Sequence, residues 1–343
     1  MGSRAMHEQL RTSVDPILLL TSPLKGEGSL LMDILSVLPQ QLVFGIALGA
    51  VYGLIALGYT MVYGILLMIN FAHGELFMIG AYVGWAVLTW LINSQFGGLH
   101  PIWVLPVLLL MAMSVTAVLG VTLERFAYRP LYTRGATRLG PLISAVGASI
   151  FLQNAVMITQ GARMKVYMTS LLFPRTWHVN IAGVRISALV LVMISVAVVL
   201  MSMLNAFVQR TTLGRCIRAV AEDREAAAIM GVNVRQVISI TFLLGSALGG
   251  AAGVLVGLYY TQIDFFMGYS AGLKAFTAAV LGGIGNLKGA MLGGLMLGVI
   301  ESLAVTFINP AYRDVVAFAV LILVLVFRPT GLLGESVPQT NKV

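Results

Sequence analysis

Long stretches without a charged side chain are the feature that most constrains this chain. No Lys, Arg, Asp or Glu stands between Asp33 and Glu75, or between Glu75 and Glu124. Further stretches of this kind cover residues 139–162, 186–209 and 236–263. A charge at the centre of a bilayer costs about 2.5–3.5 kcal/mol, and a helix needs about 20 apolar residues to cross the hydrocarbon. The pattern therefore predicts a chain that crosses a membrane many times.

Composition excludes the main alternatives. Of the 343 residues, 59% are hydrophobic and 10% are charged. Soluble domains are about 25% charged and less than half apolar, so a soluble fold is excluded. The single cysteine, Cys216, allows no disulfide framework, and the four histidines lack the spacing of metal ligands, so no metal site is expected.

Backbone polar groups have no water to bind in hydrocarbon, so each crossing must be a helix. We expect an all-α, polytopic membrane protein with eight to ten transmembrane helices. The first span is long enough for two short crossings, and 268–285 also fits a re-entrant half-helix. The expected spans are 41–67, 74–93, 102–122, 141–160, 187–208, 236–260, 268–285, 290–307 and 311–327.

Basic residues in the short loops predict the orientation. Loops 123–140 and 209–235 hold nine arginines between them, and two spans separate these loops, so they lie on one side. Segment 161–186, expected on the other side, holds four basic residues. The excess places the two loops in the cytoplasm, and with them the C-terminus. We expect a poorly ordered extension (1–35), a membrane domain (36–330) and a cytoplasmic tail (331–343).

Glycines recur at every fourth position of the 236–260 span, at Gly245, Gly249, Gly253 and Gly257. Small residues on one helix face let backbones approach closely in a membrane. This face either packs within the chain or forms a seam with a second subunit.

No enzyme motif is present: the sequence lacks a P-loop, HExxH and G-x-S-x-G. Ionisable groups at membrane depth are the remaining candidates for function. Asn70, His73 and Glu75 form a polar cluster at a span edge, either on a translocation pathway or as a turn in which Asn70 caps the next helix. Glu301 lies deepest, either as a satisfied carboxylate that faces the bundle near the membrane interface or with a role in the pathway or its gating.

Residues 221–231 (AEDREAAAIMG) predict a short helix in the 209–235 loop. Acids occupy its first turn, alanines its middle, and Gly231 ends it in the left-handed conformation. Either a cytoplasmic partner or lipid headgroups must cover its apolar residues Ala227, Ile229 and Met230, and the acids argue against headgroups.

Three segments resemble the permeases of branched-chain amino-acid ABC importers. They are Met68–Glu75 (MINFAHGE), Gly214-Arg215 followed by Ala219–Gly231, and the Gly-rich Ala279–Gly294. The first is fairly specific to that family, the second marks ABC permeases more broadly, and the third is common in membrane helices. The similarity covers residues 36–330 and is greatest to the smaller of the two permease subunits.

The resemblance implies a multi-pass permease of the bacterial inner membrane that moves branched-chain amino acids inward by alternating access. Its partners would be a second homologous permease, two cytoplasmic ATPases that bind ATP and Mg²⁺, and a periplasmic solute-binding protein that docks near 161–186 and 261–271. This chain would hold no cofactor and would not be an enzyme. Residues 221–231 would be the coupling helix seated in an ATPase. The expected coupling residues are Glu222, Asp223, Arg224, Ala226, Ala227, Ile229, Met230 and Gly231.

Two alternatives remain open from the sequence. The same assembly fits urea, short amides or other amino acids as cargo. A stand-alone secondary transporter would instead couple to an ion gradient through Glu301 and Lys274 and would need no ATPase.

Overall fold

The computed structural model describes residues 27–94, 101–134, 139–169, 172–173, 177–181 and 184–334. Most of the expected extension (1–35) and tail (331–343) therefore lies outside the described residues, and these domain boundaries stay predictions. The first described helix, α3, begins at Glu27.

The described residues are mainly helical, as the charge-free stretches predict. The helices are α3 (Glu27–Leu66), α4 (Ala72–Asn93), α5 (Pro101–Leu123), α6 (Arg129–Thr133), α7 (Leu139–Gln160), α8 (Ala188–Arg210), α9 (Thr212–Glu222), α10 (Arg224–Ile229), α11 (Val234–Tyr260), α12 (Met267–Gly282), α13 (Leu287–Phe307) and α14 (Arg313–Phe327). A π-helical turn, Glu124–Tyr128, joins α5 to α6. Two short antiparallel pairs complete the fold: β1 (Lys165–Val166) with β4 (Gln262–Ile263), and β2 (His178–Ile181) with β3 (Val184–Ser187).

Eight helices of the described part are long and apolar enough to cross a membrane, which confirms the lower end of the expected range. The idea that the first span holds two crossings is wrong, because α3 is one continuous helix. The 268–285 span is α12, whose 16 residues are fewer than the roughly 20 that a crossing needs. Its length fits the half-helix alternative.

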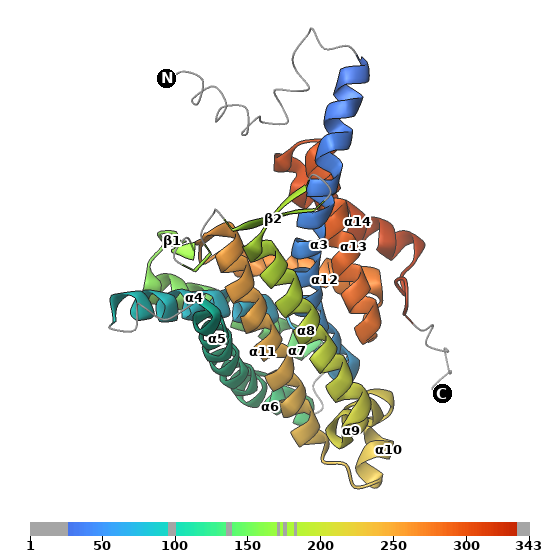
Figure 1. Cartoon of the computed structure of the whole chain (residues 1–343). Helices are drawn as coiled ribbons and strands as arrows, with labels where there is room; N and C mark the ends of the chain where they lie inside the picture. The colour runs from blue at the N-terminus through green and yellow to red at the C-terminus, as the bar shows by residue number, and fades with distance from the viewer. Residues whose placement is uncertain are drawn as a thin grey trace.

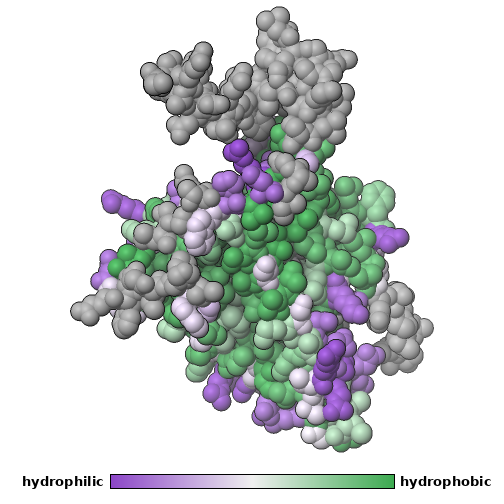
Figure 2. All heavy atoms as spheres, in the orientation of Figure 1, coloured by the Kyte–Doolittle hydropathy of each residue, from purple (hydrophilic) through white to green (hydrophobic). Residues whose placement is uncertain are grey.

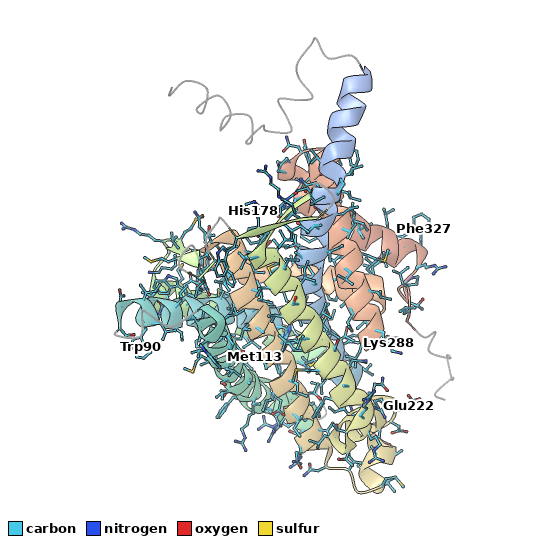
Figure 3. All side chains as sticks on the ribbon, in the orientation of Figure 1. Trp90, Met113, His178, Glu222, Lys288 and Phe327 are labelled. Carbon is cyan, nitrogen blue, oxygen red and sulfur yellow. The ribbon has the colours of Figure 1, made fainter. Side chains whose placement is uncertain are left out.

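The two ends of the bundle differ in what they carry. Figure 1 places α6, α9 and α10 at its lower end and β1 and β2 at its upper end. Figure 3 shows the same separation through Glu222 at the lower end and His178 at the upper end. The described parts of the two arginine-rich loops thus share one end of the bundle, as predicted. Between the ends, Figure 2 shows a broad apolar surface.

Helices α3 and α11 form the centre of the bundle, and most of their residues are buried. On α11, a Cβ at Gly253 would lie 2.1 Å from the carbonyl oxygen of Phe77 on α4. On α4, a Cβ at Gly80 would lie 2.4 Å from the Cα of Gly250. The glycine face of α11 therefore packs against helices of the same chain, which is the first of the two alternatives that its spacing left open.

Candidate functional site

The helical conformation is interrupted between α3 and α4, where Leu67 has a φ of 53°. Helix α4 begins at Ala72 with Phe71 at its N-cap and has no side-chain cap, so the prediction that Asn70 caps it is wrong. The Asn70 side chain instead turns away from α4: its Oδ1 accepts a hydrogen bond of 2.7 Å from the Tyr128 hydroxyl. A contact across 58 residues takes the place of the local cap.

Asn70, His73 and Glu75, which we call the α4 cluster, are each at most 2% exposed. The His73 ring packs edge to face on Tyr59, with 4.8 Å between ring centroids. Glu75 Oε1 accepts a hydrogen bond of 3.0 Å from Ser149 Oγ. Within the part of the chain that the structure describes, Asn70 Nδ2, His73 Nε2 and Glu75 Oε2 have no hydrogen-bond partner. Three buried polar groups thus remain incompletely paired at one helix start, which is uncommon in folded proteins.

A second set of charges, of which Lys274 and Glu301 are buried, joins α12, α13 and α14. Lys274 Nζ lies 2.8 Å from Glu301 Oε1 and 2.7 Å from Asp314 Oδ1, and Arg313 Nε lies 3.2 Å from the same Glu301 oxygen. We call these four residues the α12 cluster. Its two cations and two carboxylates balance in charge, and Glu301 itself is fully buried. Glu301 Oε1 is therefore ion-paired, while among the described residues Glu301 Oε2 has no hydrogen-bond partner, so the carboxylate is only partly satisfied.

The two clusters are separate. Among the described residues no hydrogen bond or ion pair joins them, although α12 packs on both α4 and α13. The sequence prediction grouped Asn70, His73, Glu75 and Glu301 on one pathway, and the structure does not bring these four side chains together.

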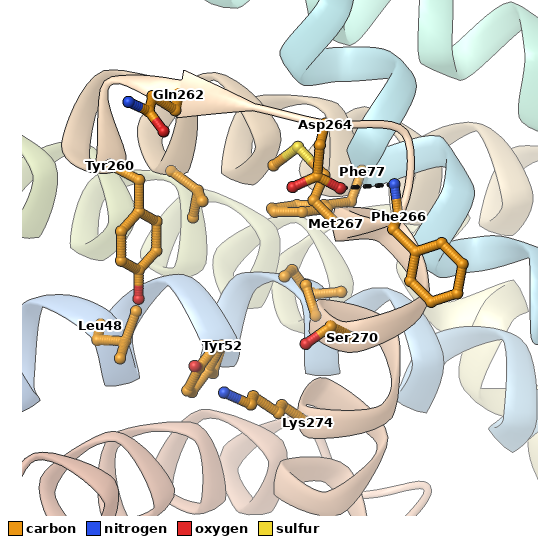
Figure 4. Close-up of a pocket in the computed structure, with 13 residues that line it drawn as sticks. Leu48, Tyr52, Phe77, Tyr260, Gln262, Asp264, Phe266, Met267, Ser270 and Lys274 are labelled. Atoms are coloured by element: carbon orange, nitrogen blue, oxygen red, sulfur yellow. Dashed lines mark hydrogen bonds between the residues drawn. The ribbon is translucent and has the colours of Figure 1, made fainter. Parts of the chain in front are cut away.

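A cavity of about 430 Å³ opens among α3, α11 and α12 and the loop that follows α11. Figure 4 shows Lys274 beside Tyr52 at one end of the cavity, Asp264 at the other, and Ser270 between them. Asp264 Oδ1 accepts a hydrogen bond of 2.7 Å from the backbone N–H of Phe266, which fixes this carboxylate. The lining residues are Leu48, Tyr52, Ile55, Phe77, Val256, Tyr260, Gln262, Asp264, Phe266, Met267, Ser270, Ala271 and Lys274.

None of Asn70, His73, Glu75 and Glu301 lines this cavity. Sequence reasoning missed Tyr52, Asp264 and Ser270, because isolated residues on separate elements form no motif. Lys274 was a usable signal in the sequence. A charged side chain inside an apolar span has a high free-energy cost in the membrane, so it must have a polar or charged partner nearby.

At the lower end of the bundle, residues 221–231 do not form one helix. Ala221 and Glu222 complete α9, and α10 runs only from Arg224 to Ile229. The break lies at Asp223, whose Oδ1 accepts hydrogen bonds from the backbone N–H groups of Glu225 and Ala226 at 2.8 and 3.0 Å. An aspartate that caps a new helix competes with the continuation of the old one, and this accounts for the corrected boundary. Gly231 has a φ of 84°, the predicted left-handed end.

Two arginines attach α9 and α10 to the ends of long helices. Arg218 donates to the carbonyl of Val208 on α8, and Arg224 donates to the carbonyl of Ile65 on α3. The last carbonyls of a helix lack internal partners and carry partial negative charge, so a guanidinium stabilises them. The Arg224 side chain is half-buried in this joint, and this burial lowers the pKa of its guanidinium.

The apolar side chains of this segment separate into two groups. Ala227 is only 5% exposed, so the expectation that a partner covers it is wrong, because the chain itself does so. Ile229 and Met230 are 85% and 83% exposed. Glu222, Asp223, Ala226 and Gly231 are exposed as well. Two large apolar side chains among polar groups form the kind of patch that marks an interaction site.

Comparison with known proteins places the chain in a family. A family model described as a branched-chain amino acid transport system permease component matches residues 41–325. The permease protein BraD of the high-affinity branched-chain amino acid transport system of Pseudomonas aeruginosa is 48% identical over 311 residues, which cover 89% of this chain and 97% of that protein. The corresponding LivH of Escherichia coli K12 is 45% identical over 308 residues, with the same coverage of both chains. LivM of that organism is also named as a permease protein of the high-affinity branched-chain amino acid transport system. It is 27% identical over 84% of this chain and 69% of its own length.

The chain therefore belongs to the family of branched-chain amino acid transport system permeases. Its relatives are named transport permeases, so it is a multi-pass membrane component of a transporter and not an enzyme.

Proposed function

We propose that this chain is a permease subunit of an ATP-driven importer that carries branched-chain amino acids into the cytoplasm by alternating access. The observation that carries the proposal is the identity of 45–48% over nine-tenths of the chain with permeases named for that transport. The exposed Ile229 and Met230 support it, because they offer an apolar contact on which a separate ATPase subunit would bind.

The proposed assembly contains a second permease, two cytoplasmic ATPases that bind ATP and Mg²⁺, and a periplasmic solute-binding protein. The similarity of this chain to both LivH and LivM of one organism supports a heterodimer of two different permease chains. The arginine-rich end of the bundle would face the cytoplasm and the strand-bearing end the periplasm, with the C-terminus inside. The binding protein would then dock near 161–186 and 261–271.

Coupling would run through α10. Ile229 and Met230 would enter a groove of an ATPase, with Glu222, Asp223 and Ala226 around them. Because Arg224 of α10 binds the end of α3 and Arg218 of α9 binds the end of α8, a joint displacement of α9 and α10 would move two membrane helices. A segment joined to the bundle at two helix ends transmits motion, whereas a free loop would bend.

Replacing both exposed apolar side chains tests this coupling. Ile229→Asp with Met230→Asp should abolish co-purification of the ATPase subunits and ATP-driven uptake, with normal insertion of the permease. Val179→Asp is the matched control, since Val179 is 47% exposed on β2 at the other end of the bundle and should leave ATPase binding unchanged. Normal ATPase binding by the double variant would refute the coupling role. Ala227 is unsuited to this test, because its substitution would disturb packing.

Reconstitution tests the wider proposal. The full assembly in liposomes should accumulate leucine, isoleucine and valine only with ATP and binding protein. Uptake by this chain alone in an ion gradient would establish the secondary transporter that couples through Glu301 and Lys274. Uptake of urea or short amides in place of leucine would retain the assembly and change the cargo.

A further inference from the structure

The cavity among α3, α11 and α12 has a chemical polarity that the family assignment does not explain. One end carries the ammonium of Lys274, the other end carries the carboxylate of Asp264, and aliphatic and aromatic side chains such as Leu48, Phe77 and Met267 form the wall between them. Its volume of about 430 Å³ lies within the roughly 300–1,000 Å³ of small-molecule sites.

We propose that this cavity is the site where the permease itself holds its amino-acid cargo, with Lys274 as the receptor for the carboxylate and Asp264 as the group that attracts the ammonium at the loop side. The apolar wall would take the aliphatic side chain. This inference rests on the proposed function, because it requires a zwitterionic cargo with an apolar tail.

Lys274 can accept such a ligand without leaving a charge unpaired. An ammonium group has three donors, and Glu301 and Asp314 account for two of them. The Asp314 side chain is 57% exposed, so it can turn to water when a cargo carboxylate takes its place. Glu301, which is fully buried, would stay paired with both Lys274 and Arg313 throughout. Lys274 is 6% exposed and lines the cavity. Its ammonium is therefore already largely removed from water, so binding a cargo carboxylate would cost little further desolvation.

Asp264 suits the other charge of the zwitterion. It belongs to the loop after α11, where β4 pairs with β1 at the end of the bundle away from α10. In the proposed orientation this is the periplasmic end, where cargo enters. A fixed carboxylate at the loop side and a fixed ammonium at the helix side would favour amino acids that enter with the carboxylate first.

Photo-leucine, a diazirine analogue of leucine, tests the site in the complete assembly in nanodiscs. Irradiation should attach it to residues 44–56, 77 or 256–271, located by peptide mass spectrometry. Leucine should compete with this labelling at least about tenfold better than leucinol, which lacks the carboxylate, and than 4-methylpentanoate, which lacks the amine. That ratio is the size expected for one charged hydrogen bond.

Each charge has its own diagnostic variant. Lys274→Gln should abolish the preference for leucine over leucinol, whereas Lys274→Arg should keep it. Asp264→Asn should reduce only the preference over 4-methylpentanoate, and this loop variant covers the case in which Lys274→Gln fails to fold. Lys288→Gln is the matched control: Lys288 is an exposed lysine on α13 outside this cavity, and both preferences should be unchanged.

Three results would overturn the inference: labelling confined to other segments, no labelling in an assembly that transports leucine, or unchanged preferences in both charge variants. All three leave the proposed function intact. That function fails separately, if the wild-type assembly transports no branched-chain amino acid.

Discussion

The two buried polar clusters differ in how their charges and polar atoms are held. In the α4 cluster, close backbone packing surrounds the side chains: a Cβ at Gly58 would lie 2.3 Å from His73 Nε2, and one at Gly268 would lie 2.5 Å from Glu75 Oε2. In the α12 cluster, opposite charges from three helices pair with one another. One cluster depends on exact fit, and the other depends on charge balance.

The two clusters also differ in whether they lie in a recognisable sequence motif and in whether they line the cavity. The α4 cluster lies in the segment that resembles the family signature, yet none of its residues lines the cavity. The α12 cluster stands outside any motif, yet its Lys274 does line it. A recognisable motif in a membrane helix can therefore lie at a tightly packed helix break, while a charged residue outside any motif lines the cavity.

The largest effect should come from breaking the charge balance. Glu301→Gln leaves the buried Lys274 and the half-buried Arg313 with the exposed Asp314 as the one carboxylate of the cluster, so we expect a loss of about 3–5 kcal/mol of folding free energy. The loss is measured by unfolding the protein in detergent–SDS mixtures.

The double variant Lys274→Met with Glu301→Met is the control for this prediction. Since it removes one cation and one carboxylate together, it should be clearly more stable than Glu301→Gln. Glu301→Gln with wild-type stability and wild-type uptake would show that the α12 cluster does not depend on charge balance.

A smaller loss should follow from disturbing the fit of the α4 cluster. A Cβ at Gly74 would lie 2.4 Å from the carbonyl oxygen of Gly268, so Gly74→Ala should cost about 2–3 kcal/mol in the same assay. Gly147→Ala on α7 is the matched control, because its Cβ would meet no atom within 4 Å. Equal stability of the two variants would contradict the close packing of α4 on α12.

Local composition was sufficient to predict most of the fold. Apolar stretches with few charges predicted nine spans. Eight of them correspond to helices of the described part that are long enough to cross a membrane, and the ninth, 268–285, is the shorter α12. The number of spans between them predicted that loops 123–140 and 209–235 share an end, and Gly231 predicted the end of α10.

Contacts between distant residues could not be predicted in the same way. Asn70 binds Tyr128 instead of capping α4, Ala227 is covered by its own chain, and Lys274 pairs with residues of two later helices. The cavity combines residues from 48 to 274, so no window of sequence contains it.

Ser149→Ala tests whether the α4 cluster needs its one bond to α7. The variant removes the hydroxyl that donates to Glu75 Oε1, and Glu75 would then have no hydrogen-bond partner among the described side chains. We expect a loss of about 1–2 kcal/mol, measured by SDS unfolding. Ser195→Ala is a suitable control, because among the described residues Ser195 bonds only the carbonyl of Leu191 on its own helix. If both variants unfold alike, the bond to Glu75 contributes nothing.

The smallest effect should come from Tyr128→Phe, which keeps the ring and removes the hydroxyl that donates to Asn70. The ring would still pack on Phe242, with 5.5 Å between centroids, so the loss should be about 1 kcal/mol, the contribution of one neutral hydrogen bond. Because this bond joins the break between α3 and α4 to the turn after α5, hydrogen exchange should rise at residues 67–71 and stay unchanged in α12. A rise in α12 as large as that at the break would show that the two clusters act as one unit, against the separation that their contacts indicate.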